Sequence, residues 1–130
     1  MNSKKAGIKM KKIVLIIFFL TSLLYLNLQA RQVDVSSIAA LQTAINNSLA
    51  GDTINLANGT YTNNTINIGK NNITVRAATP GGVYLNGTDV ITISGNYVTF
   101  SGFQFTSGTI SGTVIVVTGN YALLTQLNFS

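Results

Sequence analysis

Very few residues of this chain have side chains capable of acid–base, nucleophilic or metal-binding chemistry. The 130-residue sequence contains no Cys and no His, which excludes disulfides, thiolate or imidazole metal sites and Cys–His nucleophile pairs. It also contains no Glu, so its side-chain carboxylates are those of Asp34, Asp52 and Asp89. We therefore assign no catalytic residue and no metal site to this chain.

Lys70 and Arg76 are the best candidates for contact with a ligand. They lie close together in the sequence at adjoining strand or turn positions, where their positive charges suit an acidic glycan. The alternative, which such pairs more often represent, is a solvated pair of loop residues. We predict substrate binding by Lys70 and Arg76 and leave that alternative open.

The Asp and Tyr residues have more ordinary structural interpretations. Asp52 and Asp89 are lone carboxylates far apart in the sequence, so we expect them to cap turns rather than to bind Ca²⁺. Tyr84, Tyr97 and Tyr121 offer rings on which sugars could stack. Because Tyr97 and Tyr121 occupy the same position of an internal repeat, we expect them to form a structural column instead.

The net charge of +5 belongs to the N-terminus and not to a binding surface. Five of the six Lys residues lie within the first twelve positions, whereas from Arg31 onward three cations balance three Asp residues. With only 8% charged residues, the chain is not expected to bind nucleic acid.

The N-terminus has the layout of a secretory signal peptide. A Lys-rich start precedes the apolar run IVLIIFFLTSLLYL at 13–26, and Ala30 supplies a small residue before a cleavage point. The run reaches about 21 Å as a helix, short of the ~30 Å hydrocarbon core. We predict a signal peptide over 1–30, bacterial export to a secreted or periplasmic location, and membrane contact only during export. An uncleaved membrane anchor is the alternative.

The next segment, 36–50, predicts one amphipathic helix. Its apolar residues follow spacings of three and four and so share one face; they are Ile38, Leu41, Ile45 and Leu49. Ser36 or Ser37 suits the N-cap, and Gly51 suits a left-handed C-terminal turn. This helix is expected to cover the first strands of the domain that follows.

Beyond Gly51 the hydrophobic period changes to two, which predicts a series of short strands. Residues 91–106 align without a gap on 115–130, and the apolar pairs of 66–75 recur at 91–100. The sequence therefore repeats at a nearly constant interval. Three short strands per repeat of this length are typical of a solenoid.

We therefore predict an all-β fold, a right-handed parallel β-helix with an N-terminal amphipathic capping helix. Asn71, Asn96 and Asn120 would form a column at one turn, with amide hydrogen bonds along the stack and a left-handed backbone at Asn. An antiparallel sandwich is the alternative. The expected division is a signal peptide at 1–30, a cap at 31–52, and first rungs at 53–130 that break off within a strand, as in a truncated β-helix.

Seven short motifs in a fixed order support a family resemblance: LQTAI (41–45), AGDTI (50–54), NGTY (58–61), NITV (72–75), PGGV (80–83), LNG (85–87) and FSGFQF (100–105). This order resembles the chondroitinase B and alginate lyase family of secreted polysaccharide lyases. The resemblance covers nearly all of 33–130 and implies a pectate-lyase-like solenoid.

The resemblance also implies a function. Members of the family cleave poly(β-D-mannuronate) or dermatan chains by β-elimination, using Ca²⁺ to neutralise the uronate carboxylate and a Lys/Arg pair for the proton transfers. Those residues come from later rungs and have no matching position here, so Ca²⁺ is implied only for the full-length enzyme. We expect the N-terminal fragment of such a lyase, itself inactive, with alginate or a dermatan/chondroitin-type polymer as partner. The alternatives are a non-catalytic exported β-helix that binds glycans or acts as an adhesin, and a purely structural segment.

Overall fold

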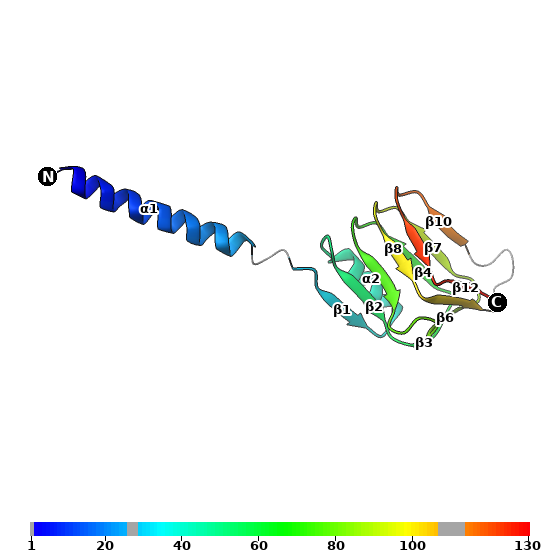
Figure 1. Ribbon diagram of the computed structural model, residues 1–130. Helices are drawn as coiled ribbons and strands as arrows, with labels where there is room; N and C mark the ends of the chain where they lie inside the picture. Colours follow the sequence, from blue (N-terminus) through cyan, green and yellow to red (C-terminus); the bar gives the residue numbers. More distant parts are fainter. Residues whose placement is uncertain (1, 26–28, 107–113) are drawn as a thin grey trace.

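Short strands separated by turns wind into a parallel β-helix, which follows a separate N-terminal helix (Figure 1). The computed structural model describes residues 2–25, 29–106 and 114–130. The helices are α1 (Asn2–Tyr25) and α2 (Ile38–Asn46). The strands are β1 (Gln32–Val35), β2 (Thr53–Leu56), β3 (Gly59–Thr62), β4 (Thr65–Ile68), β5 (Thr74–Ala77), β6 (Val83–Asn86), β7 (Val90–Ile93), β8 (Thr99–Ser101), β9 (Phe103–Thr106), β10 (Val114–Val117), β11 (Leu123–Thr125) and β12 (Asn128–Phe129).

The strands stack into three parallel sheets. Sheet 1 has the order β1-β2-β5-β8-β11, sheet 2 the order β12-β9-β6-β3, and sheet 3 the order β10-β7-β4. From β2 to β10 each rung contributes one strand to each sheet, and Ile91 lies opposite Ile66 on one side and Ile115 on the other. The sequence repeat that relates these three residues is therefore the rung of the helix. The parallel β-helix is confirmed and the antiparallel sandwich is wrong.

The core is a column of apolar side chains between the three sheets. All the apolar pairs predicted to face inward between Ile54 and Phe105 are at most 4% exposed. The rings of Phe100 and Phe103 stack with centroids 4.2 Å apart, which joins sheet 1 to sheet 2 at their corner. Because each strand turns alternate side chains toward this core, the period-two pattern is sufficient to identify it.

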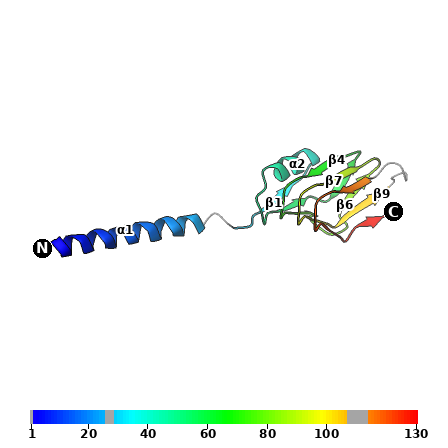
Figure 2. The same ribbon diagram turned by 90° about the horizontal axis from the view of Figure 1, so that it is seen from above.

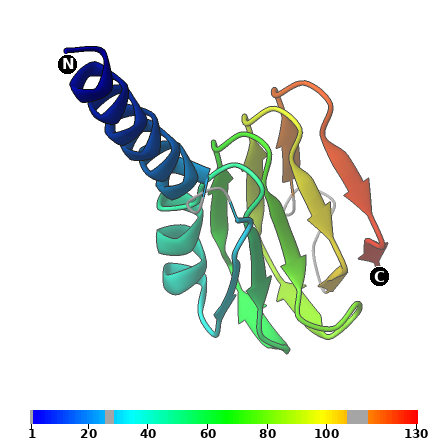
Figure 3. The same ribbon diagram turned by 60° about the vertical axis from the view of Figure 1, so that its left-hand side comes forward.

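Helix α2 covers one end of the stack, while the C-terminus lies at the other end (Figure 3). It packs against β1, β2 and β4, and Leu41 and Ile45 on its inner face are fully buried. The side chain of Ser37 caps the helix by accepting a hydrogen bond from the Ala40 N–H. The predicted capping helix is thus confirmed, with Ser37 as its N-cap.

The predicted end of this helix is wrong. Asn47 is the C-cap, and the Ser48 hydroxyl donates to the Ile45 carbonyl, so the chain has left the helix before Leu49. Leu49 is consequently 64% exposed rather than packed on the first rung. Gly51 does adopt a left-handed φ of 94°, but it forms the turn into β2 and not the helix end.

Two strands lie outside the predicted series: β1 precedes Gly51, and β3 has Tyr61 as its one apolar residue. β1 precedes α2 and extends sheet 1 beyond the first rung, with Val33 opposite Ile54. β3 has the sequence GTYT and pairs with β6, so that Tyr61 lies opposite Leu85. The Tyr61 hydroxyl donates to the Ala57 carbonyl at 2.9 Å, and burial raises the pKa of this phenol.

The turn from sheet 3 to sheet 1 contains the predicted Asn column. Asn71 Oδ1 accepts from the Asn96 N–H at 2.8 Å, and Asn96 Oδ1 accepts from the Asn120 N–H at 2.9 Å. The ladder therefore runs from side chain to main chain. Contrary to the prediction, the left-handed backbone is not at these residues but at the residue after each: Asn72, Tyr97 and Tyr121, with φ of 57°, 55° and 58°. The Asn supplies the acceptor, while its successor redirects the chain into sheet 1.

Helix α1 lies apart from the rungs in both views that show it in full length (Figures 1 and 2). The side chains of residues 4–19 are exposed, including those of apolar residues such as Ile16 and Phe18. None of the helices in the described ranges has the combination of length and hydropathy that a membrane crossing requires.

Candidate functional site

A row of polar side chains crosses the outer face of sheet 1 at one position of successive strands. The register aligns, from β1 to β8, Asp34, Asn55, Arg76 and Ser101. Alternate residues of a strand point to opposite faces, so these side chains point away from the core that Val75 and Phe100 fill. The row is the one place where the fold brings a strand cation into line with several hydrogen-bonding side chains among the described residues.

Asn55 is the central member of this row. Its Nδ2 donates to Asp34 Oδ1, and its Oδ1 accepts from Arg76 Nε at 2.7 Å. Asn55 is only 5% exposed, so a buried amide fixes the orientation of the exposed arginine. The ion pair found within the described ranges joins Arg31 to Asp52, which leaves Arg76 without a carboxylate partner there.

A small groove lies beside Arg76. It has a volume of about 180 Å³ and is lined by Arg76, Ala77, Ala78, Pro80, Ser101, Gly102 and Gln126. The Ser101 hydroxyl donates to Gln126 Oε1 at 3.1 Å across one rung spacing. The groove therefore combines a guanidinium, a hydroxyl and an amide with walls of small apolar residues.

Lys70, the second predicted binding residue, lies elsewhere. It is exposed in the turn between β4 and β5, at the corner where sheet 3 meets sheet 1. Its carbonyl oxygen comes so close to Gly95 that a Cβ there would collide with it, so only glycine fits at that position. No described contact joins the Lys70 side chain to Arg76, so the structure does not bring the two cations together in one cluster.

The aromatic column at the same corner is structural, as expected. Tyr97 and Tyr121 stack with ring centroids 4.8 Å apart and planes within 11°. One face of each ring is therefore occupied by the other ring. Tyr84 lies on β6 in sheet 2, away from this pair, and is 39% exposed.

Asp52 fastens the segment before β1 to the first rung. Its carboxylate, only 2% exposed, accepts from Arg31 Nε at 2.8 Å, from the Arg31 N–H at 3.1 Å and from the Leu49 N–H at 2.9 Å. Burial alone would raise the pKa of Asp52, but these hydrogen bonds and the guanidinium charge outweigh it and hold the pKa below its usual value. Asp52 is thus an ionised anchor between a turn and Arg31.

Asp89 is likewise committed to a turn. Its Oδ1 accepts from both the main-chain N–H and the Nδ2 of Asn64, at 2.9 Å each, and the residue is fully buried. Across the described ranges there is no group of three or more acidic residues suited to a metal ion. Asp52 and Asp89 thus accept main-chain hydrogen bonds at turns, as expected of capping residues.

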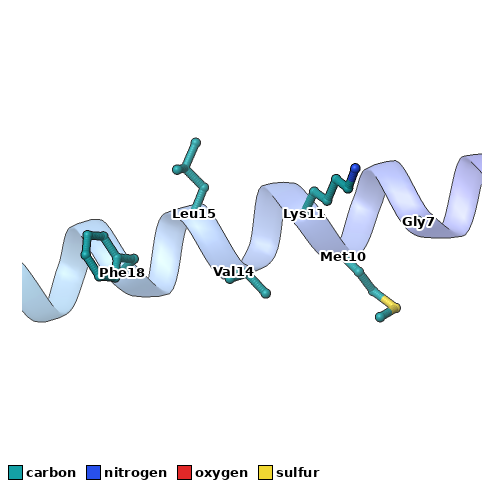
Figure 4. Close-up of a pocket in the computed structure, with 6 residues that line it drawn as sticks. All are labelled: Gly7, Met10, Lys11, Val14, Leu15 and Phe18. Carbon is teal, nitrogen blue, oxygen red and sulfur yellow. The ribbon is translucent and has the colours of Figure 1, made fainter.

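The larger hollows of the described surface are not sites of this kind. One of about 510 Å³ is lined by six residues of α1 alone, and Figure 4 shows them spaced along a single helix with their side chains on different sides. Another, of about 530 Å³, lies between α2 and the outer edge of β1. Neither gathers more than one cation, and the groove beside Arg76 is the better candidate for a polar ligand.

The fold and this outer polar row define a class of protein: a parallel β-helix with a row of polar side chains across the outer face of one sheet. Comparison with known families gives the particular one. The family model described as Chondroitinase B matches residues 35–125, and the chain belongs to that family. No curated protein sequence matched the chain.

Solved structures agree with this assignment. The PL6 family alginate lyase AlyGC superposes with a TM-score of 0.67 at 28% identity, covering 75% of this chain and 15% of that one. A second PL6 alginate lyase, solved in complex with a trisaccharide, gives a TM-score of 0.63 at 29% identity and covers 77% of this chain and 22% of that one. This chain therefore spans less than a quarter of the length of either enzyme.

Sequence reasoning found Arg76 and missed its neighbours. Ser101 could have been predicted from the repeat, because an alignment shifted by one repeat places it opposite Arg76. One repeat further on, Thr125 lies opposite Ser101. Gln126 is the next residue and could have been found from this alignment. Asn55 precedes Arg76 by less than one full repeat, so the period did not point to it.

Proposed function

We propose that this chain is the N-terminal part of a secreted polysaccharide lyase that cleaves uronic-acid polysaccharide, such as alginate or a dermatan/chondroitin-type polymer, by β-elimination. The family match over 35–125 supports the class of enzyme. The observation that carries a role for this chain is Arg76, a cation held by buried Asn55 on the outer face of sheet 1 and without a carboxylate partner in the described ranges.

The role that fits these rungs is binding and not proton transfer. β-Elimination requires neutralisation of the uronate carboxylate, removal of the neighbouring C5 proton, and protonation of the leaving oxygen. Arg76 and Lys70 can contribute to the first requirement, and we propose both as substrate-binding residues. Both oxygens of Asp52 accept hydrogen bonds, and Asp89, whose Oδ2 has no described partner, is fully buried, so neither carboxylate is exposed to a ligand.

The described residues also do not fit a Ca²⁺ site. Ca²⁺ takes six to eight oxygen ligands, often from several carboxylates. Here both oxygens of Asp52 accept hydrogen bonds from Arg31, and Asp89 is buried far along the chain. In our proposal any dependence on Ca²⁺ therefore belongs to the whole enzyme and not to these rungs.

Export is part of the proposal. Helix α1 has a Lys-rich start and exposed apolar side chains, as a signal peptide requires, and Ala30 precedes the first strand. Mass spectrometry of the exported protein should show a chain that begins near Arg31. Recovery of all 130 residues in the membrane fraction would contradict cleavage and support the anchor.

Affinity electrophoresis of the full chain in mild detergent tests the function. Alginate or dermatan sulfate in the gel should retard the protein, whereas neutral mannan should not. Incubation with the same polymers should release no unsaturated uronate detectable by ultraviolet absorbance. Equal migration in all gels would overturn the proposal. Turnover that is lost on Lys70→Ala or Arg76→Ala would instead place an active site within these rungs.

A non-catalytic exported β-helix that binds glycans is the second candidate. The engagement of Asp52 and Asp89 in turns favours it, because such a protein needs cations but no base. Expression of the gene with all of its coding sequence distinguishes the two: unsaturated product supports the lyase, and retardation without product supports the binding protein.

A further inference from the structure

We propose that the groove beside Arg76 is a subsite for the carboxylate of a single sugar residue, formed by Arg76, Ser101 and Gln126. This inference rests on the proposed function, because an acidic polysaccharide is the ligand that would present such a carboxylate along the rungs. It adds a binding residue, Gln126, a positioning residue, Ser101, and a specific chemistry to the role of Arg76.

The guanidinium of Arg76 is oriented by one hydrogen bond, and its other N–H donors remain available. Its Nε donates to Asn55 Oδ1, and that is the one hydrogen bond of its side chain among the described residues. The two terminal nitrogens are therefore available for a paired hydrogen bond to a carboxylate, the geometry in which arginine binds such groups most strongly. Asp34 does not neutralise this charge directly, because Asn55 lies between them and bonds to both.

Ser101 and Gln126 add a neutral side to the groove. Ser101 is 9% exposed and lies opposite Arg76, one rung further on. Its hydroxyl donates to Gln126 Oε1, which leaves the Nε2 donors of the same amide for a ligand. A carboxylate or a sugar hydroxyl in the groove would thus meet donors from the Arg76 guanidinium and from Gln126 Nε2, while Ser101 orients the amide.

The backbone at Gln126 fixes where its amide side chain starts. Gln126 has a left-handed φ of 54°, whereas the preceding rung has Gly102 with a φ of 83° at the corresponding turn. Glycine takes this conformation without penalty, but glutamine does not. Asn72, Tyr97 and Tyr121 adopt the same conformation to turn the chain at another corner, and at Gln126 it forms the turn whose side chain lines the groove.

The size of the groove limits what it can hold. Its volume of about 180 Å³ is below the ~300–1,000 Å³ of clefts that enclose a drug-sized ligand. Ala77, Ala78 and Pro80 form walls that leave room beside the guanidinium without competing for its hydrogen bonds. One sugar residue of a longer chain fits this description, with the rest of the polymer lying outside the groove.

Nuclear magnetic resonance titration of the ¹⁵N-labelled full chain in detergent micelles tests the subsite. The probes are a mannuronate tetrasaccharide and, as the matched neutral ligand, mannotetraose. The acidic probe should shift the Gly102 amide, the Gln126 side-chain NH₂ and the Arg76 Nε–H, and the neutral probe should not. Arg76→Gln should weaken binding about tenfold or more, because it removes a charged hydrogen-bond donor pair.

Three further variants separate the groove from general charge. Lys12→Gln removes the same charge from α1, outside the rungs, and should change affinity less than about twofold. Arg76→Lys keeps the charge but loses the planar guanidinium with its paired donors, and should bind almost as weakly as Arg76→Gln. Gln126→Gly relieves the left-handed backbone while deleting the amide, so it should bind less tightly although it folds at least as well.

The outcomes distinguish this inference from the proposed function. Tetrasaccharide binding that Arg76→Gln leaves unchanged, or that Lys12→Gln weakens as much as Arg76→Gln does, overturns the subsite while uronan binding stands. Shifts at the groove without any retardation by polymer support the subsite and overturn the proposed function. The absence of shifts at the three reporter groups with the acidic probe overturns the subsite.

Discussion

The two ends of the β-helix present the same kind of residue in opposite environments. At the N-terminal end, Leu41 and Ile45 of α2 close the core and are fully buried. On the last described rung, Leu123 and Phe129 are 56% and 62% exposed. Phe129 stacks on Phe105 with ring centroids 4.7 Å apart, and yet Phe105, at the same position one rung earlier, is only 4% exposed.

The difference shows that a repeat position is not by itself a core position. Residues of a solenoid become buried when a neighbour lies on both sides of them along the axis. α2 provides such a neighbour for the first rung, as Figure 3 shows, and it does so with a helix rather than with another strand. Substitutions at matched positions of the two ends should therefore differ strongly in their effect on stability.

The largest effect is expected for Leu41→Asp. The substitution places an unpaired charge against the apolar first rung, and its cost, about 5 kcal/mol or more, is comparable to the total stability of a small domain. Urea unfolding followed by circular dichroism should show loss of the cooperative transition. Leu49→Asp is the matched control and should change the free energy of unfolding by less than about 0.5 kcal/mol. Equal effects at both positions would mean that α2 does not cap the core.

A comparison of Phe105→Ala with Phe129→Ala measures the contrast within one aromatic stack. Removal of the buried ring should cost about 3–5 kcal/mol, whereas removal of the exposed one should cost less than about 1 kcal/mol. The midpoints of urea unfolding give both values. A larger loss for Phe129 would show that the last rung is covered in solution, for example by a second molecule.

Asp52→Asn should destabilise the N-terminal end by about 2–4 kcal/mol at neutral pH, because it leaves Arg31 and the turn at Leu49 without their acceptor charge. The folded-state pKa of Asp52 is lowered, so its contribution is complete above the unfolded value of about 3.9 and disappears as pH falls through the lower folded value. The free energies of unfolding of wild type and variant, measured from about pH 6 to about pH 2, should therefore become equal in acid. A difference in the free energy of unfolding that increases on acidification would contradict the role of Asp52 as an ionised anchor.

The smallest effect on stability is expected for Leu124→Thr on the last rung. Leu124 is 39% exposed, so the free energy of unfolding should change by less than about 0.5 kcal/mol. Self-association should fall, since exposed strand edges with apolar side chains favour pairing between molecules. Sedimentation velocity of the two proteins at matched concentrations measures this, and unchanged association would place the contact surface elsewhere.

The rung architecture could be predicted because the core follows a rule that the sequence displays directly. Ile66, Ile91 and Ile115 differ by one repeat each and occupy one column. Leu49 could not be placed in the same way, because the end of α2 depends on Asn47 and Ser48, whose side-chain and cap hydrogen bonds override the apolar spacing. Local polar contacts thus decided the boundary that hydrophobic periodicity left undetermined.

The candidate site was only partly predictable for a related reason. Arg76 could be singled out by its charge, whereas Ser101 and Gln126 are ordinary residue types whose importance comes from their register with it. Asn55 was not predicted because the first rung is shorter. Its separation from Arg76 along the chain is therefore smaller than the repeat length of the later rungs. The partners of a charged residue in a β-helix must be sought by alignment of rungs, including those of unequal length.

The contact between Arg31 and Asp52 gives the proposed export a consequence for folding. The main-chain N–H of Arg31 donates to Asp52 Oδ1 at 3.1 Å while its side chain donates to Oδ2. If cleavage follows Ala30, hydrolysis converts that neutral amide into a terminal ammonium group at the same carboxylate. The mature chain would then hold its first residue by two positive charges instead of one, so removal of the leader would itself tighten the attachment of the new N-terminus to the first rung.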